Sequence, residues 1–304
     1  ATNLTGPRRL RYGTARDIVI GTAAVLADGS EVKAGGRVVK NVAGYDLNKL
    51  FIGSVGTLGV ITRLTFKVLP MPPERAAVIA TLARADDAHR LAQRIAGSVL
   101  TPLTLDIAGP GALPRLSAQS VHSAGEAWSV VVEIGGTPAT LARTRAELLA
   151  LARNASAEVA VLEGEVLDEA MAALRDFGHA PGREAALLLR LAVLPSQVGE
   201  AIALLVGAMP DGAPPAIVAR AGNGVVYAAW RAMGPAAALA VVERLRRDLA
   251  RLGGVLVVER CPPDAKARLE VWGIEGPDLA LMGRLKQAYD PSGLLSPGRG
   301  PGRL

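Results

Sequence analysis

The stretch Gly35–Pro70, GGRVVKNVAGYDLNKLFIGSVGTLGVITRLTFKVLP, decides how the rest of the chain is interpreted. Glycines recur at every third position in its middle, at Gly53, Gly56 and Gly59. Glycine is needed where a backbone adopts positive φ or approaches a ligand more closely than a Cβ allows. Apolar and polar residues then alternate over 63–68, which predicts a half-buried strand. A glycine-lined turn that leads into a strand can present backbone N–H groups to an anion.

The spacing of these glycines alone indicates an ordinary glycine-rich loop, because it is neither a dinucleotide fingerprint followed by a helix nor a nucleotide P-loop. Read as a whole, however, residues 40–70 resemble the second half of the FAD-binding domain of the vanillyl-alcohol-oxidase flavoproteins, the PCMH-type domain. In that family a K-x-x-x-G-Y-D-x-x-x-L-x-x-G-S-x-G-T-L-G-x-I-T block wraps the FAD. More narrowly, the stretch resembles the FAD-binding E subunit of the bacterial glycolate oxidase complex.

Both ends of the chain extend this resemblance. The start, ATNLTGPRRLRYGTARD, is similar to a family segment that passes beside the FAD, and the tail is similar to a closing D-P-x-G-x-L-N-P-G-R motif, with Ser296 in place of the Asn. The resemblance implies FAD as the cofactor, bound by Thr2, Asn3, Gly6, Gly13, Lys40, Gly44, Tyr45, Gly53, Gly56, Gly59, Val60 and Ile61. The family also has a leading subdomain with a pyrophosphate loop, which we expect before Ala1.

Composition limits the possible functions. Half of the 304 residues are apolar and only 3% are aromatic, which predicts an aliphatic core in one or two domains. The net charge of +6 comes from scattered arginines, which argues against a nucleic-acid partner and favours attraction of anionic substrates or an acidic partner. The single cysteine, Cys261, excludes an intrachain disulfide and an iron–sulfur cluster and favours a cytoplasmic location. No apolar run reaches the length of a membrane span, so we expect at most peripheral membrane association through partners.

Residues 74–282 carry an internal duplication. Each copy follows the β-α-β-β-α-β order of a ferredoxin-like unit. In the first copy the pattern predicts strands and helices at Ala76–Ala83, Asp86–Ala96, Thr101–Ile107, Trp128–Ile134, Pro138–Arg153 and Glu158–Leu162. In the second it predicts them at Ala185–Leu194, Ser196–Gly207, Ala216–Arg220, Val225–Trp230, Gly234–Leu252 and Val255–Glu259. Thr137 and Ser196 are predicted helix N-caps.

The predicted fold class is therefore α+β. Residues 1–73 form the second half of an FAD-binding domain, in which an apolar strand over 17–26 and the turn Asp28-Gly29 predict a hairpin. Residues 74–282 form a cap domain of two ferredoxin-like units that share an antiparallel sheet, as the substrate domain does in the resembled family. Residues 283–304 return to the FAD domain.

The hydroxy-acid-oxidising members of this family carry an H-x-G-D-G-N-x-H motif that supplies metal ligands and a base. The matching segment here is Arg220–Tyr227, in which Ala221 and Tyr227 occupy the two histidine positions. We therefore predict no metal. The histidines of the chain, His89, His122 and His179, lie in none of the matched motifs and are interpreted as surface or structural residues.

No catalytic residue is assigned from the sequence, but Arg190, Tyr227 and Glu259 are candidates, with Arg220 and Arg231 as further cations. Arg190 interrupts the apolar run AALLLRLAVL, so its charge needs a protein partner or an anionic ligand. A structural salt bridge is an equal alternative, and Glu259 with its neighbour Arg260 can equally form a rim ion pair.

The resemblance implies an FAD-dependent oxidoreductase subunit, namely the FAD-binding subunit of a glycolate oxidase that converts glycolate to glyoxylate. Its partners would be a sister flavoprotein subunit and an iron–sulfur subunit, and its substrate a small 2-hydroxy acid. Two alternatives stay open. One is an independent FAD-dependent oxidase or dehydrogenase of another substrate, with Tyr227 or Glu259 in place of the lost histidine. The other is a non-catalytic scaffold subunit.

Overall fold

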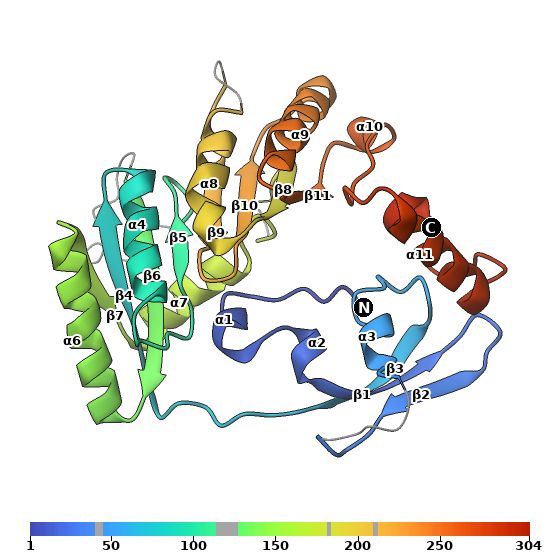
Figure 1. The fold of residues 1–304 in the computed structure, drawn as a ribbon, viewed down its shortest axis with the longest axis horizontal. Helices are drawn as coiled ribbons and strands as arrows, with labels where there is room; N and C mark the ends of the chain where they lie inside the picture. Colours follow the sequence, from blue (N-terminus) through green and yellow to red (C-terminus); the bar gives the residue numbers. More distant parts are fainter. Residues whose placement is uncertain (40–44, 114–126, 181–183, 209–211) are drawn as a thin grey trace. The chain divides into compact units, whose positions relative to one another are not determined.

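The structure, a computed structural model, describes residues 1–39, 45–113, 127–180, 184–208 and 212–304 (Figure 1). The chain divides into two compact units, each described here by itself. Unit 1 comprises residues 1–5, 12–70 and 270–304, and unit 2 comprises residues 6–11 and 71–269. Two predicted FAD contacts, Lys40 and Gly44, lie outside the described residues, as does His122.

Unit 1 contains a three-stranded antiparallel sheet in the order β2-β1-β3, built from β1 (Val19–Val25), β2 (Glu31–Gly35) and β3 (Val60–Phe66). The predicted hairpin is confirmed, since β1 and β2 pair around a turn in which Gly29 takes φ +83° and Asp28 accepts from the Ser30 amide at 2.9 Å. The helices of this unit are α2 (Ala15–Ile18), α3 (Asn48–Phe51), α11 (Pro277–Tyr289) and the 3-10 turn η2 (Pro301–Arg303).

The core of unit 1 is small. Ala24, Phe51 and Leu58 are buried together, and the Phe51 ring meets the ring of Tyr289 edge-on at 5.9 Å between centroids. The prediction that the strand after the glycines is half-buried is wrong, because Leu64 and Phe66 remain 38% and 50% exposed. The reason is that β3 is an edge strand and the described elements of unit 1 do not cover these side chains.

Unit 2 is built on an eight-stranded sheet in the order β11-β8-β10-β9-β5-β6-β4-β7, with every neighbouring pair antiparallel. The strands are β4 (Glu74–Leu82), β5 (Asp106–Ala108), β6 (Trp128–Gly136), β7 (Glu158–Leu162), β8 (Leu187–Ala192), β9 (Ala216–Arg220), β10 (Val225–Trp230) and β11 (Val255–Arg260). The helices are α1 (Arg9–Tyr12), which begins in the 6–11 segment, α4 (Ala85–Ala96), α6 (Pro138–Asn154), α7 (Gly164–Arg175), η1 (Pro195–Gln197), α8 (Val198–Val206), α9 (Pro235–Ala250) and α10 (Pro263–Lys266).

The duplication is confirmed. One half of the sheet runs β7-β4-β6-β5 and the other runs β11-β8-β10-β9, so the two halves are mirror-ordered and meet at their β5 and β9 edges. The joining register pairs Asp106 with Arg220, Ile107 with Ala219 and Ala108 with Val218. The predicted α+β class with two ferredoxin-like units sharing one antiparallel sheet is what the structure has.

The repeat helices α4, α6, α8 and α9 cover one face of this sheet (Figure 1). In α4, for example, the buried residues Ala88, Leu91, Ala92 and Ile95 follow the spacing of one helix face. The predicted cap at Thr137 is confirmed, because its hydroxyl accepts from the Thr140 amide at 3.4 Å. Among the described residues, no helix combines the length and the apolar character that crossing a bilayer requires.

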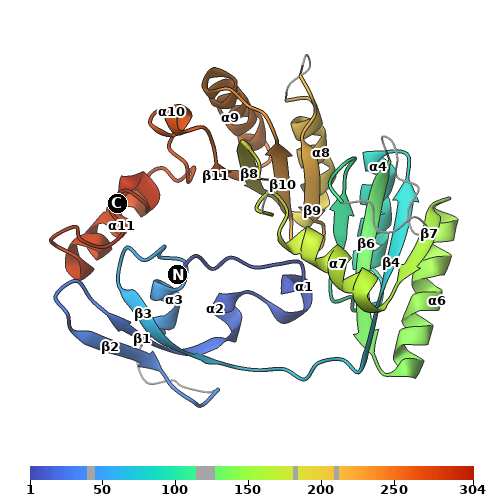
Figure 2. The same ribbon diagram turned by 180° about the vertical axis from the view of Figure 1, so that it is seen from behind.

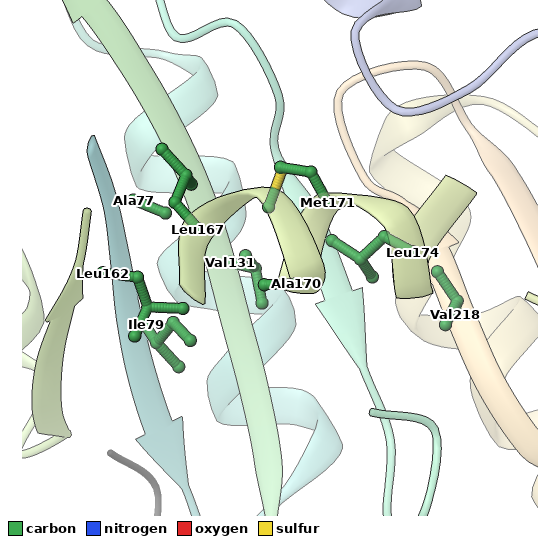
Figure 3. Close-up of a cluster of buried hydrophobic side chains, with 9 residues drawn as sticks. All are labelled: Ala77, Ile79, Val131, Leu162, Leu167, Ala170, Met171, Leu174 and Val218. Atoms are coloured by element: carbon green, nitrogen blue, oxygen red, sulfur yellow. The ribbon is translucent and has the colours of Figure 1, made fainter. Parts of the chain in front are cut away.

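Helix α7 connects the two repeats on the opposite face and was not predicted (Figure 2). It buries Leu167, Ala170, Met171 and Leu174 against the sheet, where they join Ala77, Ile79, Val131, Leu162 and Val218 (Figure 3). The contacts reach β4, β6 and β7 of the first repeat and β9 of the second. Helix α7 therefore covers mainly the first half of this face.

Two local predictions are wrong. The strand expected over 101–107 is only Asp106–Ala108, because Pro102 has no N–H and the Thr104 hydroxyl accepts the Glu133 amide at 3.2 Å in place of a ladder bond. Ser196 is not a helix N-cap, because Pro195–Gln197 form a 3-10 turn and α8 begins at Val198 without a side-chain cap.

A fully buried carboxylate ties the 6–11 segment to the sheet of unit 2. Glu133 on β6 has no exposed side-chain area and accepts from Arg8 Nε at 2.8 Å and from Arg75 at 3.0 Å. Arg75 also binds Asp168 of α7 at 2.8 Å. One carboxylate is thus shared by two cations from separate segments, and its removal leaves both without their central partner.

We expect Glu133→Gln to lower the free energy of unfolding by about 3 kcal/mol, at the low end of the cost of breaking a buried ion pair because Arg8 is 43% exposed. The measurement is urea denaturation of the full chain followed by circular dichroism. Glu147→Gln, which breaks an exposed pair with Arg143 on α6, is the control and should cost about 0.5 kcal/mol or less. Equal losses in the two variants would contradict the central role of Glu133.

Candidate functional site

The glycine turn of unit 1 binds the first residue of the chain through backbone hydrogen bonds. The carbonyl oxygen of Ala1 accepts from the amides of Gly53 at 2.8 Å and Val55 at 3.1 Å, and the Thr57 amide donates to Ser54 at 3.0 Å. The expectation that this turn offers its N–H groups to an anion is therefore wrong for Gly53, Val55 and Thr57, because those donors already have backbone acceptors.

The three glycines are needed for different reasons. Gly53 and Gly56 take φ of +94° and +79°, which L-residues with side chains rarely adopt, as expected. Gly59 instead packs tightly, since a Cβ there would lie 3.0 Å from the Phe51 ring. Of the two residues that follow, Val60 is 56% exposed and Ile61 packs against the core of unit 1.

The structure brings part of the predicted FAD set together. Asn3, at φ +51°, lies beside Gly53, and its side-chain oxygen accepts from the Arg16 amide at 3.3 Å. Thr2 accepts from the Leu4 amide at 3.4 Å, and Gly13 takes φ +76° before α2. Gly6 belongs to unit 2, where it lies against Arg175.

A cavity of about 250 Å³ opens beside β1 and β2 of unit 1, lined in part by Arg16, Tyr45, Asn48 and Lys49. Asn48 is only 5% exposed, and its Oδ1 has no hydrogen-bond partner within the described part of the chain. Its Nδ2 donates to Asp46 at 2.9 Å. Tyr45, a predicted cofactor contact, is 95% exposed at the same cavity. No sequence pattern pointed to Asn48 as a site residue.

This cavity fits a part of a dinucleotide. Its volume lies below the range of roughly 300–1,000 Å³ that is usual for whole-ligand sites. A buried acceptor without a donor costs free energy unless a ligand or water supplies the missing hydrogen bond. Asn48 Oδ1 is suited to an amine or hydroxyl of a nucleotide, and the cation Arg16 is suited to a phosphate. Lys49 is paired with Asp46 at 3.2 Å, and both line the cavity.

The tail is anchored to the glycine turn through Lys286. Lys286 on α11 donates to Asp290 at 2.6 Å, to the Thr57 carbonyl at 3.0 Å and to the Leu295 carbonyl at 2.8 Å. Asp290 is 2% exposed and accepts the amides of Leu294 and Leu295. Burial raises the pKa of Asp290, but the hydrogen bonds from Lys286 and the two amides outweigh it and hold the pKa at about 2.

In unit 2, the candidates Arg190, Tyr227 and Glu259 come together on the face that carries α7. Arg190 on β8 donates through Nε to Glu259 on β11 at 2.7 Å. Tyr227 on β10 lies opposite Arg190 in the strand register, so both side chains are on the same face. His179, which follows α7, contacts Glu259 Oε2 through Nε2 at 3.2 Å. We call Arg190, Tyr227, Glu259 and His179 the β8–β11 cluster.

Burial, followed by the negative charge of Glu259, raises the pKa of Tyr227, while the cations Arg220, Arg190 and Arg9 oppose this effect. The phenol is therefore a neutral hydrogen-bond donor near pH 7. The Arg220 guanidinium lies 5.7 Å from the centroid of its ring.

The remaining cations are less suited to a substrate. Arg220 is 4% exposed and donates to Asp106 at 2.9 Å and to the Leu174 carbonyl, and Arg231 lies on the surface after β10. Burial raises the pKa of Asp106, against the opposing charge of Arg220. His179, interpreted as a surface or structural residue, is 39% exposed and contacts the carboxylate of Glu259, which lies 80 residues away and which no local pattern reveals. Among the described residues, no group of three or more His, Cys, Asp and Glu side chains could hold a metal ion.

The chain is similar to known proteins in sequence and in structure. Residues 265–299 match the family described as FAD linked oxidases, C-terminal domain. The chain is 28% identical to the glycolate oxidase subunit GlcD of Bacillus subtilis over 98% of this chain and 66% of that protein. It is 51% identical to the glycolate oxidase subunit GlcE of Escherichia coli over 24% of this chain and 21% of that protein. A mitochondrial D-lactate dehydrogenase [cytochrome] of Arabidopsis thaliana is 27% identical over 98% of this chain and 55% of that protein.

The chain therefore spans less than two thirds of the length of these relatives. Among solved structures, p-cresol methylhydroxylase with substrate bound superimposes with a TM-score of 0.66 at 15% identity, over 93% of this chain and 64% of that one. This likeness concerns the fold, and it confirms the predicted combination of a partial PCMH-type FAD-binding domain with a duplicated cap.

We expect the Lys286–Asp290 pair to make the tail of unit 1 sensitive to acid. Because the pKa of Asp290 in the folded protein lies below its ordinary value of 3.8, its contribution to stability is complete above that value and is lost as the pH falls toward about 2. Hydrogen exchange at neutral pH should show faster exchange of the Leu294 and Leu295 amides in Asp290→Asn than in the wild type. The acid-induced change in Trp272 fluorescence, which reports on the tail through its bond to the Arg299 carbonyl, should be smaller in the variant.

The control for this prediction is Asp28→Asn. Its carboxylate has a pKa lowered by Ser30 but lies in the β1–β2 turn, away from the tail. It should leave the exchange of Leu294 and Leu295 unchanged. Unchanged exchange in Asp290→Asn as well would contradict the anchoring role of Asp290.

Proposed function

We propose that this chain, which has the fold of the PCMH-type FAD-linked oxidases, is part of an FAD-dependent oxidoreductase that oxidises small 2-hydroxy acids. The relatives support this, because two are named glycolate oxidase subunits and one is named a D-lactate dehydrogenase. Glycolate and D-lactate are both small 2-hydroxy acids. The family match at 265–299 supports FAD as the cofactor. The FAD contacts named above and the division of the chain after residues 73 and 282 are parts of this proposal.

The narrower proposal is an FAD-binding subunit of a glycolate oxidase that works with a sister flavoprotein subunit and an iron–sulfur subunit. The local identity of 51% to GlcE supports the E-type role, while the longer match to GlcD supports a flavoprotein subunit more generally. The cytoplasmic location expected from the single cysteine belongs to the same proposal.

The observation that carries the proposal is the β8–β11 cluster. It places a cation, a neutral phenol and a carboxylate side by side on the sheet of unit 2, next to the β9–β10 turn where the family's hydroxy-acid motif falls. A 2-hydroxy acid presents a carboxylate and a hydroxyl, which need a cation and hydrogen-bonding groups at neighbouring positions. Residues from strands far apart in sequence supply them here.

The roles follow from the contacts. Arg190 uses Nε for Glu259, which leaves its two terminal nitrogens to hold the substrate carboxylate. Tyr227 donates its phenolic proton to the substrate, because its raised pKa keeps the group neutral. Glu259 fixes the direction of Arg190. Bound FAD supplies the two-electron acceptor.

The independent enzyme of another substrate and the non-catalytic scaffold remain the alternatives. The loss of the motif histidines at Ala221 and Tyr227 is what favours them. Full-length protein that purifies without flavin and does not take up added FAD would support the scaffold. Flavin that is present but is not reduced by glycolate or D-lactate would support the enzyme of another substrate.

We expect Arg190→Lys, tested in the full-length protein with FAD, to raise the KM for glycolate or D-lactate about tenfold. Lysine keeps the charge beside Glu259 but loses the planar fork that binds a carboxylate through two bonds. The measurement is anaerobic flavin reduction over a range of acid concentrations. Arg143→Lys, on the exposed side of α6, is the matched control and should leave KM unchanged. An unchanged KM in Arg190→Lys contradicts substrate binding at the β8–β11 cluster.

A further inference from the structure

We propose that His179 accepts the hydroxyl proton of the substrate, with Glu259 as its positioning residue. This inference rests on the proposed function and adds the proton acceptor that the motif comparison leaves unassigned. The sequence gives no reason to choose His179, since it lies in the connection between the two repeats. The choice comes from where the fold places its ring.

The turn after α7 places His179 at the end of the sheet. The His179 amide donates to the Asp176 carbonyl at 2.9 Å, and Gly178 takes φ +77°, so the chain turns sharply here. A Cβ on Gly178 would lie 2.6 Å from Leu188 on β8, which shows how closely the turn packs on the strand. Phe177 packs against Leu188 in the same small cluster. Packing on β8 therefore fixes the backbone turn that carries His179.

One nitrogen of the His179 ring contacts Glu259, and the other can accept a hydrogen bond or a proton. Nε2 contacts Glu259 Oε2 at 3.2 Å, and Nδ1 makes no hydrogen bond within the residues that the structure describes. The side chain is 39% exposed, so a small ligand can reach it. A carboxylate that accepts Nε2–H fixes the tautomer in which Nδ1 has the free lone pair. This is the arrangement in which a histidine takes a proton.

The charged groups that face His179 come from three elements. Glu259 lies on β11, Arg190 on β8 contacts the other oxygen of Glu259, and Asp176 lies at the end of α7. Asp176 interacts electrostatically with His179 but is bound mainly by Arg175, whose hydrogen bond lowers the Asp176 pKa. Two carboxylates, those of Glu259 and Asp176, therefore lie near the ring.

The other groups of the β8–β11 cluster are less suited to this step. Tyr227 is kept neutral, because burial and Glu259 raise its pKa, and Glu259 is 12% exposed and already accepts from Arg190 and His179. Arg190 has no lone pair to offer. Of the described groups in the cluster, His179 is the one that combines an available lone pair with access to solvent.

The proposed step is a two-electron oxidation of the 2-hydroxy acid. The O–H bond of the 2-hydroxy acid breaks, and its proton forms a bond to His179 Nδ1. The C–H bond at the same carbon breaks with its electron pair, and bound FAD would supply the acceptor for that hydrogen and pair. The oxygen–carbon bond becomes a double bond, so the acid is oxidised by two electrons to a 2-oxo acid and the FAD is reduced by two. The proton on His179 returns to water.

The first test uses a readout other than turnover. The chain has three histidines, so selective ¹³C,¹⁵N-histidine labelling of the full-length protein gives a simple NMR spectrum. The probe is oxalate, which carries carboxylates but no C–H bond to lose. We expect oxalate to shift the imidazole signal that is absent in His179→Gln, and to leave the signal absent in His89→Gln unchanged, because His89 on α4 contacts the Ser196 carbonyl instead. Binding of oxalate without a shift of the His179 signal overturns the proposal.

The second test is anaerobic flavin reduction by glycolate or D-lactate in the full-length protein. We expect His179→Gln to bind oxalate within about twofold of the wild type but to reduce its flavin about 100- to 1,000-fold more slowly, with the acid limb of the pH–rate profile lost. Glu259→Gln should slow reduction about tenfold while retaining that limb, as expected for one weakened orienting bond. His89→Gln should behave as the wild type.

Failure of the proposed role of His179 can be distinguished from failure of the proposed function. Wild-type rates in His179→Gln, with the wild type itself active, overturn the role of His179 and leave the proposed function standing. The same holds if His179→Gln loses oxalate binding, because its role is then in binding. No flavin reduction by either acid in the wild type overturns the proposed function and this inference together.

Discussion

The ion pair between Asp106 and Arg220 is the interaction on which unit 2 depends. The two residues lie opposite each other where β5 meets β9, and both are buried, at 1% and 4% exposure. Asp106 Oδ2 and Arg220 Nε have no partner within the described residues, so the pair is not an efficient source of stability. Its effect is on register: a shift by one residue at the seam would leave two buried charges unpaired, and the repeats could no longer share one sheet.

The same seam explains why charged and polar side chains lie on one face of the sheet. The face opposite the repeat helices carries Glu133, Asp106, Arg220, Tyr227 and Arg190, each from a different strand. In the first half these charges are neutralised among themselves and under α7, by Arg75, Arg8 and Asp168. In the second half Arg190, Glu259 and His179 keep hydrogen-bonding capacity that the described residues do not use.

The sequence was informative where structure is local. Three strands, Glu158–Leu162, Ala216–Arg220 and Val225–Trp230, were predicted with the bounds that they have, because each is a short apolar run between clear turns. Helix α7 was missed although Leu167, Ala170, Met171 and Leu174 follow helical spacing. Nonlocal partners could not be predicted. The Ala1 carbonyl accepts the Gly53 amide from 52 residues away along the chain. His179 contacts Glu259 only because the whole second repeat is folded.

The connector helix has a consequence for stoichiometry. Because β5 and β9 are antiparallel and the halves are mirror-ordered, an approximate twofold axis passes through the sheet between them. A perfectly symmetric sheet would offer two equivalent ligand positions, one on each side of this axis. Helix α7 covers the first side, and its chain continues to His179 on the second. The proposed site at the β8–β11 cluster therefore has a covered counterpart, and we expect one bound acid per chain.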